Sequence, residues 1–326
     1  MRYQFSFYKQ ENFEELVALA KKAYQWECPF VSLSRMLSCR GFHPRFKDNA
    51  NAWEHTIGMY WENEQLVACV WNEGIYEGEE FFLFDSKERA QEVELLQDMI
   101  NYARMYCTNI EDGNVRSMNI WVPDWNETLK KLVLEKGMTK GGWQDHCYIF
   151  EFEKKHYEVK LPEGYSIIDG NTTPAFYLSN VHRVAFGYGN NEYACEHGAE
   201  AFEDIRKMKY YDKDLELCVL DAYGRPVAIA NIWADPDLEY CELEPLGVVW
   251  WERRKGLGTA ILHEAMNRVL AKYPKCKGMR GGDQPFYHNI GFKEMESISN
   301  YTWKRKVIIS WEDGSKDENY AKEMEW

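Results

Sequence analysis

The chain of 326 residues is longer than one average domain, and its hydrophobic content of 45% is enough to fill two buried cores. Its formal net charge of −14 argues against a nucleic-acid partner, because an acidic surface repels a phosphate backbone, and it is compatible with a cationic amine. The first ten residues lack the apolar core of a signal peptide, and no later stretch has the ~20 apolar residues of a membrane span. We therefore expect a cytoplasmic protein with no membrane contact.

The nine cysteines and eight histidines show no metal-binding pattern. No two cysteines form a Cys-x-x-Cys pair, and the histidines include no His-Glu-x-x-His motif. We expect no metal cofactor.

Apolar periodicity in the first half predicts alternating helices and strands. Residues 1–10 alternate like a strand, and two β-rich runs on either side of a short polar turn at 62–65 predict a hairpin. The expected helices are 11–25, 87–106 and 126–136, and the expected strands are 56–61, 66–71, 81–84, 117–122 and 146–152.

The second half repeats this order of elements. After a linker at about 156–163 we expect a helix at 175–186, a hairpin of strands 215–220 and 227–233, a strand at 240–248, a helix from 257, and a final helix and strand that end at 306. Two halves with one element order suggest an internal duplication. The predicted domains are therefore 1–156 and 160–306, followed by an acidic tail at 307–326.

One stretch of the second half, from Leu246 to Leu262, predicts a strand, a tight loop and a helix. Gly256 and Gly258 allow a sharp turn with accessible backbone N–H groups, and the first turn of a helix carries a partial positive charge. This combination is typical of an anion-binding site. Residues 251–280 contain eight Lys or Arg against two Glu, which in an acidic chain favours a polyphosphate ligand.

The loop lacks the Lys-Ser/Thr pair of a P-loop and the third glycine of a dinucleotide-binding fingerprint. Its sequence Arg253-Arg254-Lys255-Gly256-Leu257-Gly258 instead resembles the Arg/Gln-x-x-Gly-x-Gly/Ala motif of the GCN5-related N-acetyltransferase (GNAT) superfamily. The resemblance implies a mixed α/β fold and acetyl-CoA as cosubstrate, with the loop on the pyrophosphate and the preceding strand on the pantetheine arm. The cofactor-binding residues implied in this way are Leu246, Gly247, Val248, Arg253, Arg254, Lys255, Gly256, Leu257, Gly258 and Thr259.

A second resemblance lies at Tyr287-His288-Asn289-Ile290-Gly291-Phe292, which is similar to the Tyr-x-x-x-Gly-Phe of the last GNAT helix. It implies that Tyr287 protonates the departing thiolate. A phenol suits this step because its pKa of about 10 is slightly above the pKa of about 8.5 of a thiol.

The base that deprotonates an amine acceptor is sought on the strand that precedes the loop. Strand alternation would place Glu242, Glu244, Leu246 and Val248 on one face, with Pro245 as a local break in the ladder. Glu244 is the first candidate for the base and Glu242 the second, while solvated acids that only flank the strand are the alternative.

The first half has Asp85-Ser86-Lys87-Glu88-Arg89 where the second half has its glycine loop, and Leu132 or Val133 where the second half has Tyr287. It therefore resembles a degenerate GNAT domain without a cofactor loop. We expect a tandem protein whose second half transfers an acetyl group from acetyl-CoA to a primary amine of a small molecule or peptide, by direct attack in a ternary complex.

The sequence leaves two alternative functions and the oligomeric state open. A catalytically silent acyl-CoA-binding or sensory protein is the alternative function. A nucleotide-phosphate enzyme would need a magnesium-binding hydroxyl or carboxylate next to the loop, and the only candidate, Thr259, is poorly spaced. A homodimer is compatible with the sequence.

Overall fold

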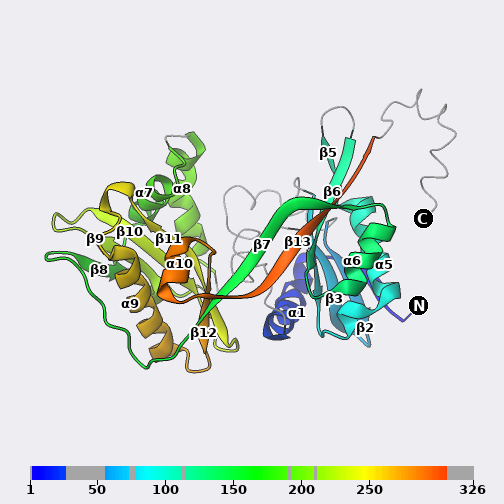
Figure 1. The fold of residues 1–326 in the computed structure, drawn as a ribbon, viewed down its shortest axis with the longest axis horizontal. Coiled ribbons are helices and arrows are strands. Elements are labelled where there is room, and N and C mark those ends of the chain that lie inside the picture. The colour runs from blue at the N-terminus through cyan, green and yellow to red at the C-terminus, as the bar shows by residue number, and fades with distance from the viewer. Residues whose placement is uncertain are drawn as a thin grey trace. The chain divides into compact units, whose positions relative to one another are not determined.

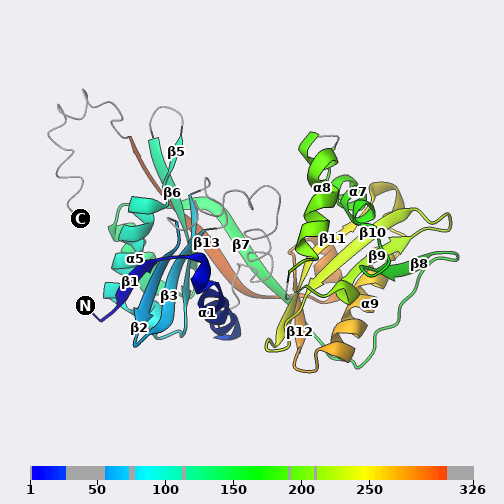
Figure 2. The same ribbon diagram turned by 180° about the vertical axis from the view of Figure 1, so that it is seen from behind.

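The computed structural model describes residues 2–26, 56–72, 78–111, 115–189, 192–208 and 211–306, so the predicted tail at 307–326 lies outside the described part. These residues form two compact units, each a mixed sheet with helices against it (Figures 1 and 2). Among the described residues, unit 1 holds those up to Asp145 and those from Glu296, and unit 2 holds those from His146 to Met295.

Unit 1 has a sheet in the order β1-β2-β3-β4-β6-β13, with β5 paired to β6. Its strands are antiparallel except at β4 and β6. The elements are β1 (Gln4–Phe7), η1 (Gln10–Asn12), α1 (Phe13–Trp26), β2 (Gly58–Glu62), β3 (Gln65–Asn72), β4 (Glu79–Phe84), η2 (Arg89–Gln91), α5 (Val93–Tyr106), β5 (Asn109–Glu111), β6 (Val115–Pro123), α6 (Glu127–Glu135), the first part of β7 (Thr139–Glu151) and most of β13 (Lys293–Lys306).

The helices of unit 1 form where apolar residues recur at helical spacing. On α5 the buried stripe is Leu95, Leu96, Met99, Ile100 and Ala103, which packs in one core with β3, β4 and β6. Asn126 caps the N-terminus of α6, because its side chain accepts a hydrogen bond from the Leu129 N–H at 2.9 Å.

Unit 2 has a sheet in the order β7-β12-β11-β10-β9-β8, in which only β11 and β12 are parallel. Its further elements are β8 (Ser166–Asp169), α7 (Ala175–Ala185), α8 (Glu192–Ile205), η3 (Lys213–Leu215), β9 (Glu216–Leu220), β10 (Pro226–Trp233), β11 (Tyr240–Val248), η4 (Trp250–Glu252), α9 (Leu257–Lys272), β12 (Gly278–Gly281) and α10 (Pro285–Ile290).

Helices cover both faces of the unit 2 sheet near the end of β11. A Cβ at Gly247 would lie 2.9 Å from Ala185 at the end of α7, whereas a Cβ at Gly258 in α9 would lie 3.8 Å from Val248. Because neighbouring residues of a strand point to opposite faces, α7 and α9 lie on opposite sides of β11.

The last strand of each half completes the sheet of the other half's unit. Strand β7 ends the first half, and its residues from Tyr148 to Glu151 pair with β12 in unit 2. Strand β13 ends the second half, and its residues from Ile298 to Lys306 pair with β6 in unit 1. The compact units therefore have other bounds than the predicted domains 1–156 and 160–306.

Most predicted elements are present with small shifts at their ends. The predicted helix at 87–106 is divided into η2 and α5, and the strand predicted at 146–152 begins earlier, at Thr139. Helix α8 was not predicted. None of the described helices is both long and apolar enough to cross a membrane.

Candidate functional site

The loop between β11 and α9 has the backbone geometry of an anion-binding site. Arg254 and Gly256 both adopt positive φ, at 68° and 83°, so the chain turns sharply before α9 begins. Gly256 precedes the first residue of α9, and no side chain caps that helix end. The N–H groups of the first helical turn therefore have no intrahelical acceptor, and they carry the positive end of the helix dipole.

The three cations of the loop have different roles. Arg253 is bound to backbone, because its Nε donates to the Val248 carbonyl at 3.1 Å and its Nη2 to the Ala185 carbonyl at 2.9 Å. Lys255 donates to the buried carboxylate of Glu252 at 2.9 Å, and this hydrogen bond raises the pKa of Lys255. Arg254 is exposed and makes no hydrogen bond or ion pair with the described residues. It is the side chain best placed to meet an anion.

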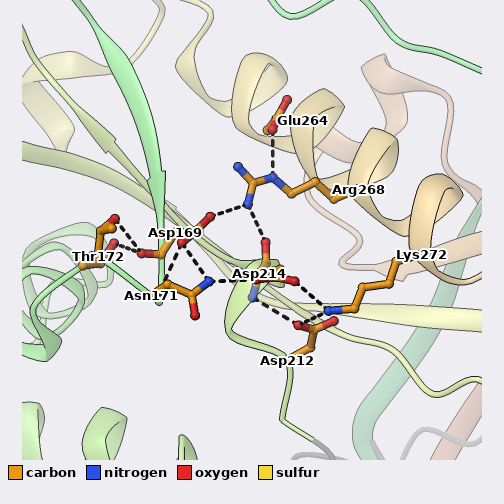
Figure 3. A network of polar contacts seen from close by, with 9 residues as sticks. Asp169, Asn171, Thr172, Asp212, Asp214, Glu264, Arg268 and Lys272 are labelled. Atoms are coloured by element: carbon orange, nitrogen blue, oxygen red, sulfur yellow. Dashed lines mark hydrogen bonds and ion pairs between the residues drawn. The ribbon is translucent and has the colours of Figure 1, made fainter.

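The remaining basic residues of 251–280 do not form an open cationic surface. On α9, Arg268 and Lys272 project from the helix into a group of acids (Figure 3). The ion pairs there are Arg268 with Glu264 and Asp169, and Lys272 with Asp212 and Asp214, each between 2.7 and 2.8 Å. Lys275 and Lys277 also pair with acids, and Arg280 is 7% exposed. Most basic residues of 251–280 are thus paired with acids of the chain itself, so fewer cations are available to a ligand than the sequence count indicates.

Strand β11 has a partner on its β12 side for only part of its length. The parallel ladder of β11 with β12 covers Tyr240, Cys241 and Glu242, whereas the antiparallel ladder with β10 continues to Val248. Beyond Glu242, the edge of β11 that faces away from β10 is not paired with β12, and its Val248 carbonyl accepts from Arg253 instead. An extended ligand with amide groups could pair with this edge, as a strand would.

The predicted side-chain alternation along β11 is wrong beyond Glu244. Leu243 pairs with Ile232 and Leu246 pairs with Ala230, so two residues, Glu244 and Pro245, face the single residue between Ala230 and Ile232. This bulge puts Leu246 and Val248 on the face of Leu243, opposite to Glu242. The Glu244 carbonyl at the bulge accepts a hydrogen bond from the Trp233 indole at 2.7 Å.

Tyr287 lies in α10, a short helix between Pro285 at its N-terminus and Gly291 at its C-terminal end, where φ is +114°. The Tyr287 side chain is 9% exposed. Its ring packs edge-on against Phe286 and Phe292, and a Cβ at Gly281 would lie 2.9 Å from it.

The pKa of Tyr287 is raised above its ordinary value, first by burial and second by the negative charge of Glu244, against the effect of a hydrogen bond with the Gly282 backbone. The structure thus brings Tyr287 and Glu244 within electrostatic reach of each other. It also removes the near match in pKa between phenol and thiol that the sequence led us to expect.

The other predicted residues contribute in different ways. The Leu257 side chain is 1% exposed and belongs to the core, so only its backbone can face a ligand. Thr259 is half-buried in the first turn of α9. The hydrogen bond from the Tyr165 hydroxyl to the Glu252 carboxylate, at 2.7 Å, is not predicted by the sequence. No local pattern signals it, because the two residues are far apart in the chain.

Unit 1 has a different arrangement at the corresponding place. After β4 the chain forms η2, and the Arg89 guanidinium donates to Asp85 at 2.7 Å, to Glu62 at 2.9 Å and to the Tyr3 hydroxyl at 2.8 Å. The cation of this segment is therefore bound by groups of the chain itself. Within the described residues of both units, no three His, Cys, Asp or Glu side chains are grouped as metal ligands would be.

Comparison with known proteins gives a result at the level of structure. No protein-family model and no curated protein matches the sequence. A GCN5-related N-acetyltransferase from Sphaerobacter thermophilus is 12% identical, with a TM-score of 0.58, over 95% of this chain and 98% of that one. A tandem GNAT protein from the clavulanic acid biosynthesis pathway is 13% identical, with a TM-score of 0.60, over 93% of this chain and 98% of that one. This chain has the GNAT fold.

A GNAT-family acetyltransferase from Colwellia psychrerythraea is 10% identical, with a TM-score of 0.54, over 92% of this chain and 99% of its own. These likenesses span both units, so the predicted fold class of two GNAT-like halves is confirmed. At such identities they concern the fold.

Proposed function

We propose that unit 2 is an acyl-CoA-dependent N-acyltransferase that transfers the acetyl group of acetyl-CoA to a primary amine. The proposal rests on one observation. The pairing of β11 with β12 ends at Glu242, shortly before the N-terminus of α9, which no side chain caps. A ligand with an anionic pyrophosphate and an amide-containing arm matches both features. The N–H groups of the first α9 turn and Arg254 would hold the pyrophosphate, and the edge of β11 beyond its ladder with β12 would hold the arm.

In this proposal the amine attacks the thioester directly and Glu244 accepts a proton from it, with Glu242 as the second candidate. Backbone N–H groups on the edge of β11 beyond its ladder with β12 stabilise the oxyanion. Because its pKa is raised, Tyr287 stays protonated and donates a hydrogen bond to the departing sulfur, without complete proton transfer.

The same raised pKa favours the second candidate, a protein that binds acyl-CoA without turnover. A phenol that does not release its proton is a weaker acid toward a thiolate. Binding and thiol release must therefore be measured separately.

The test of binding is a calorimetric titration of acetyl-CoA into the wild type and Arg254→Glu. We expect micromolar affinity in the wild type and at least a tenfold loss in the variant, because the new carboxylate lies beside the phosphate site. Lys140→Glu makes the same change in net charge at an exposed residue of unit 1 and should keep the wild-type affinity.

Absence of binding to the wild type would contradict the proposal. Binding with no thiol release from any primary amine in a broad acceptor screen would leave the silent acyl-CoA-binding protein as the function.

A further inference from the structure

Two adjacent indoles lie on the surface immediately before the anion-binding loop. The exposed fractions of Trp250 and Trp251 are 67% and 49%, although large aromatic side chains are usually well buried. Their ring centroids are 5.2 Å apart and their planes are at 89°, so the two rings form a right-angled corner. Nothing in the proposed reaction uses this pair.

Hydrogen bonds to other parts of unit 2 hold the short helix η4, which carries these indoles. Glu252, the last residue of η4, is 6% exposed and accepts hydrogen bonds from Lys255 at 2.9 Å and Tyr165 at 2.7 Å. The Val249 N–H, at the start of η4, donates to the Val227 carbonyl at 3.0 Å. Because these hydrogen bonds restrict the motion of η4, the exposed indole rings stay in one place. This lowers the entropic cost of stacking a ligand on them.

The hairpin turn beside η4 adds a third aromatic ring and an arginine, Arg225, whose guanidinium is paired with Asp221 at 2.6 Å. Tyr223 is 84% exposed, and the Arg225 guanidinium lies 5.0 Å from the centre of its ring. Arg225 interacts electrostatically with Glu252, which places this turn next to η4. Exposed aromatic rings next to a cationic site for phosphates are the combination that proteins use to hold a nucleotide base.

We propose that Trp250 and Trp251 form a stacking site for the adenine of acyl-CoA. The inference rests on the proposed function, since it assigns the nucleotide end of the same ligand. Only one residue separates Trp251 from Arg253, the first cation of the loop, so the indoles adjoin the place where the pyrophosphate would bind. The adenine is joined to that pyrophosphate through one ribose and contacts the indole faces. The corner suits a flat ring, with stacking on one indole and an edge contact with the other.

The test compares three ligands by calorimetry on the full chain: CoA, dephospho-CoA and 4′-phosphopantetheine, which lacks the adenosine. For the double variant Trp250→Ala, Trp251→Ala we expect at least about fivefold weaker binding of CoA and of dephospho-CoA, given the usual strength of base stacking on an aromatic side chain. The affinity for 4′-phosphopantetheine should stay within twofold of the wild-type value. Replacement of both indoles by Phe should restore part of the loss.

Trp143→Ala is the matched control, because Trp143 is a 75% exposed indole of unit 1. It should leave all three affinities unchanged. Equal losses for CoA and 4′-phosphopantetheine in the double variant, or no loss for either, would overturn the stacking site. A changed sedimentation coefficient with unchanged CoA affinity would overturn it too, and would assign the indoles to contact between copies of the chain. Failure of the wild type to bind either CoA or 4′-phosphopantetheine would instead contradict the proposed function.

Discussion

Tyr287 shows how the environment of one residue alters the role that its sequence position suggests. Its place before Gly291 and Phe292 could be found by pattern, but the burial and the neighbouring Glu244 charge that raise its pKa could not. We expect Tyr287→Phe to lower the rate of thiol release about 100-fold with little change in acetyl-CoA affinity. In the wild type the rate should not fall between pH 8 and 10 through ionisation of Tyr287, because a raised pKa keeps the phenol protonated. A fall in that range that Tyr287→Phe abolishes would contradict this role.

His182 gives a prediction about stability in acid. Burial lowers the pKa of His182 to about 4, whereas the unfolded chain binds this proton near pH 6.5. Between these two values the unfolded state holds more protons, so the free energy of unfolding decreases as the pH falls. Integration from pH 7.5 to 5 gives a loss of about 2 kcal/mol.

The measurement is urea unfolding of the wild type and His182→Gln at pH 7.5 and pH 5. The variant lacks the titrating group, so its loss of stability between the two values should be smaller by about 2 kcal/mol. His156→Gln, at an exposed imidazole of the same unit, is the matched control. An identical loss in the wild type and His182→Gln would contradict the prediction.

At the scale of elements, the close approach of α7 to β11 depends on one missing side chain. A Cβ at Gly247 would lie 2.9 Å from the Ala185 Cβ and 3.1 Å from the Phe186 ring. We expect Gly247→Ala to lower the free energy of unfolding by about 1–3 kcal/mol through overpacking. Gly142→Ala, where a Cβ would meet nothing within 4 Å, should change it by less than about 0.5 kcal/mol. Urea unfolding of both variants decides this, and equal stabilities would rule out a tight contact.

The elements also show what could be predicted from sequence. The glycine loop and α9 follow from local rules, since the turn needs positive φ and the apolar stripe needs a core. The bulge at Glu244 and Pro245 depends on the register with β10, and the bonds from Arg253 to Val248 and Ala185 depend on how α7 packs. The net charge of residues 251–280 also overstated the positive charge available to a ligand. The acids that neutralise Arg268 and Lys272 come mostly from distant parts of the chain, such as Asp169 and Asp212.

At the scale of the whole molecule, the exchange of last strands determines which fragments can fold. Residues 146–295 include the part of β7 that pairs with β12, whereas residues 157–306 lack it and carry β13 without its partner β6. In the second fragment the four-residue strand β12 would become an exposed sheet edge.

We therefore expect the fragment 146–295 to unfold cooperatively and to bind acetyl-CoA, and the fragment 157–306 to be less stable and to aggregate. Thermal unfolding and sedimentation of both fragments provide the check. Equal stability and solubility would show that β7 is dispensable for unit 2.

The exchanged strands also set an order of events during synthesis. Asp124 and Ser299, hydrogen-bonded at 3.0 Å in unit 1, are 175 residues apart in the chain. At the usual rate of translation, β6 leaves the ribosome roughly 10–35 s before the strand that will cover it. Synthesis of unit 1 thus begins first, but its sheet is completed last, when β13 pairs with β6. During that interval the β6 edge is open to other nascent chains.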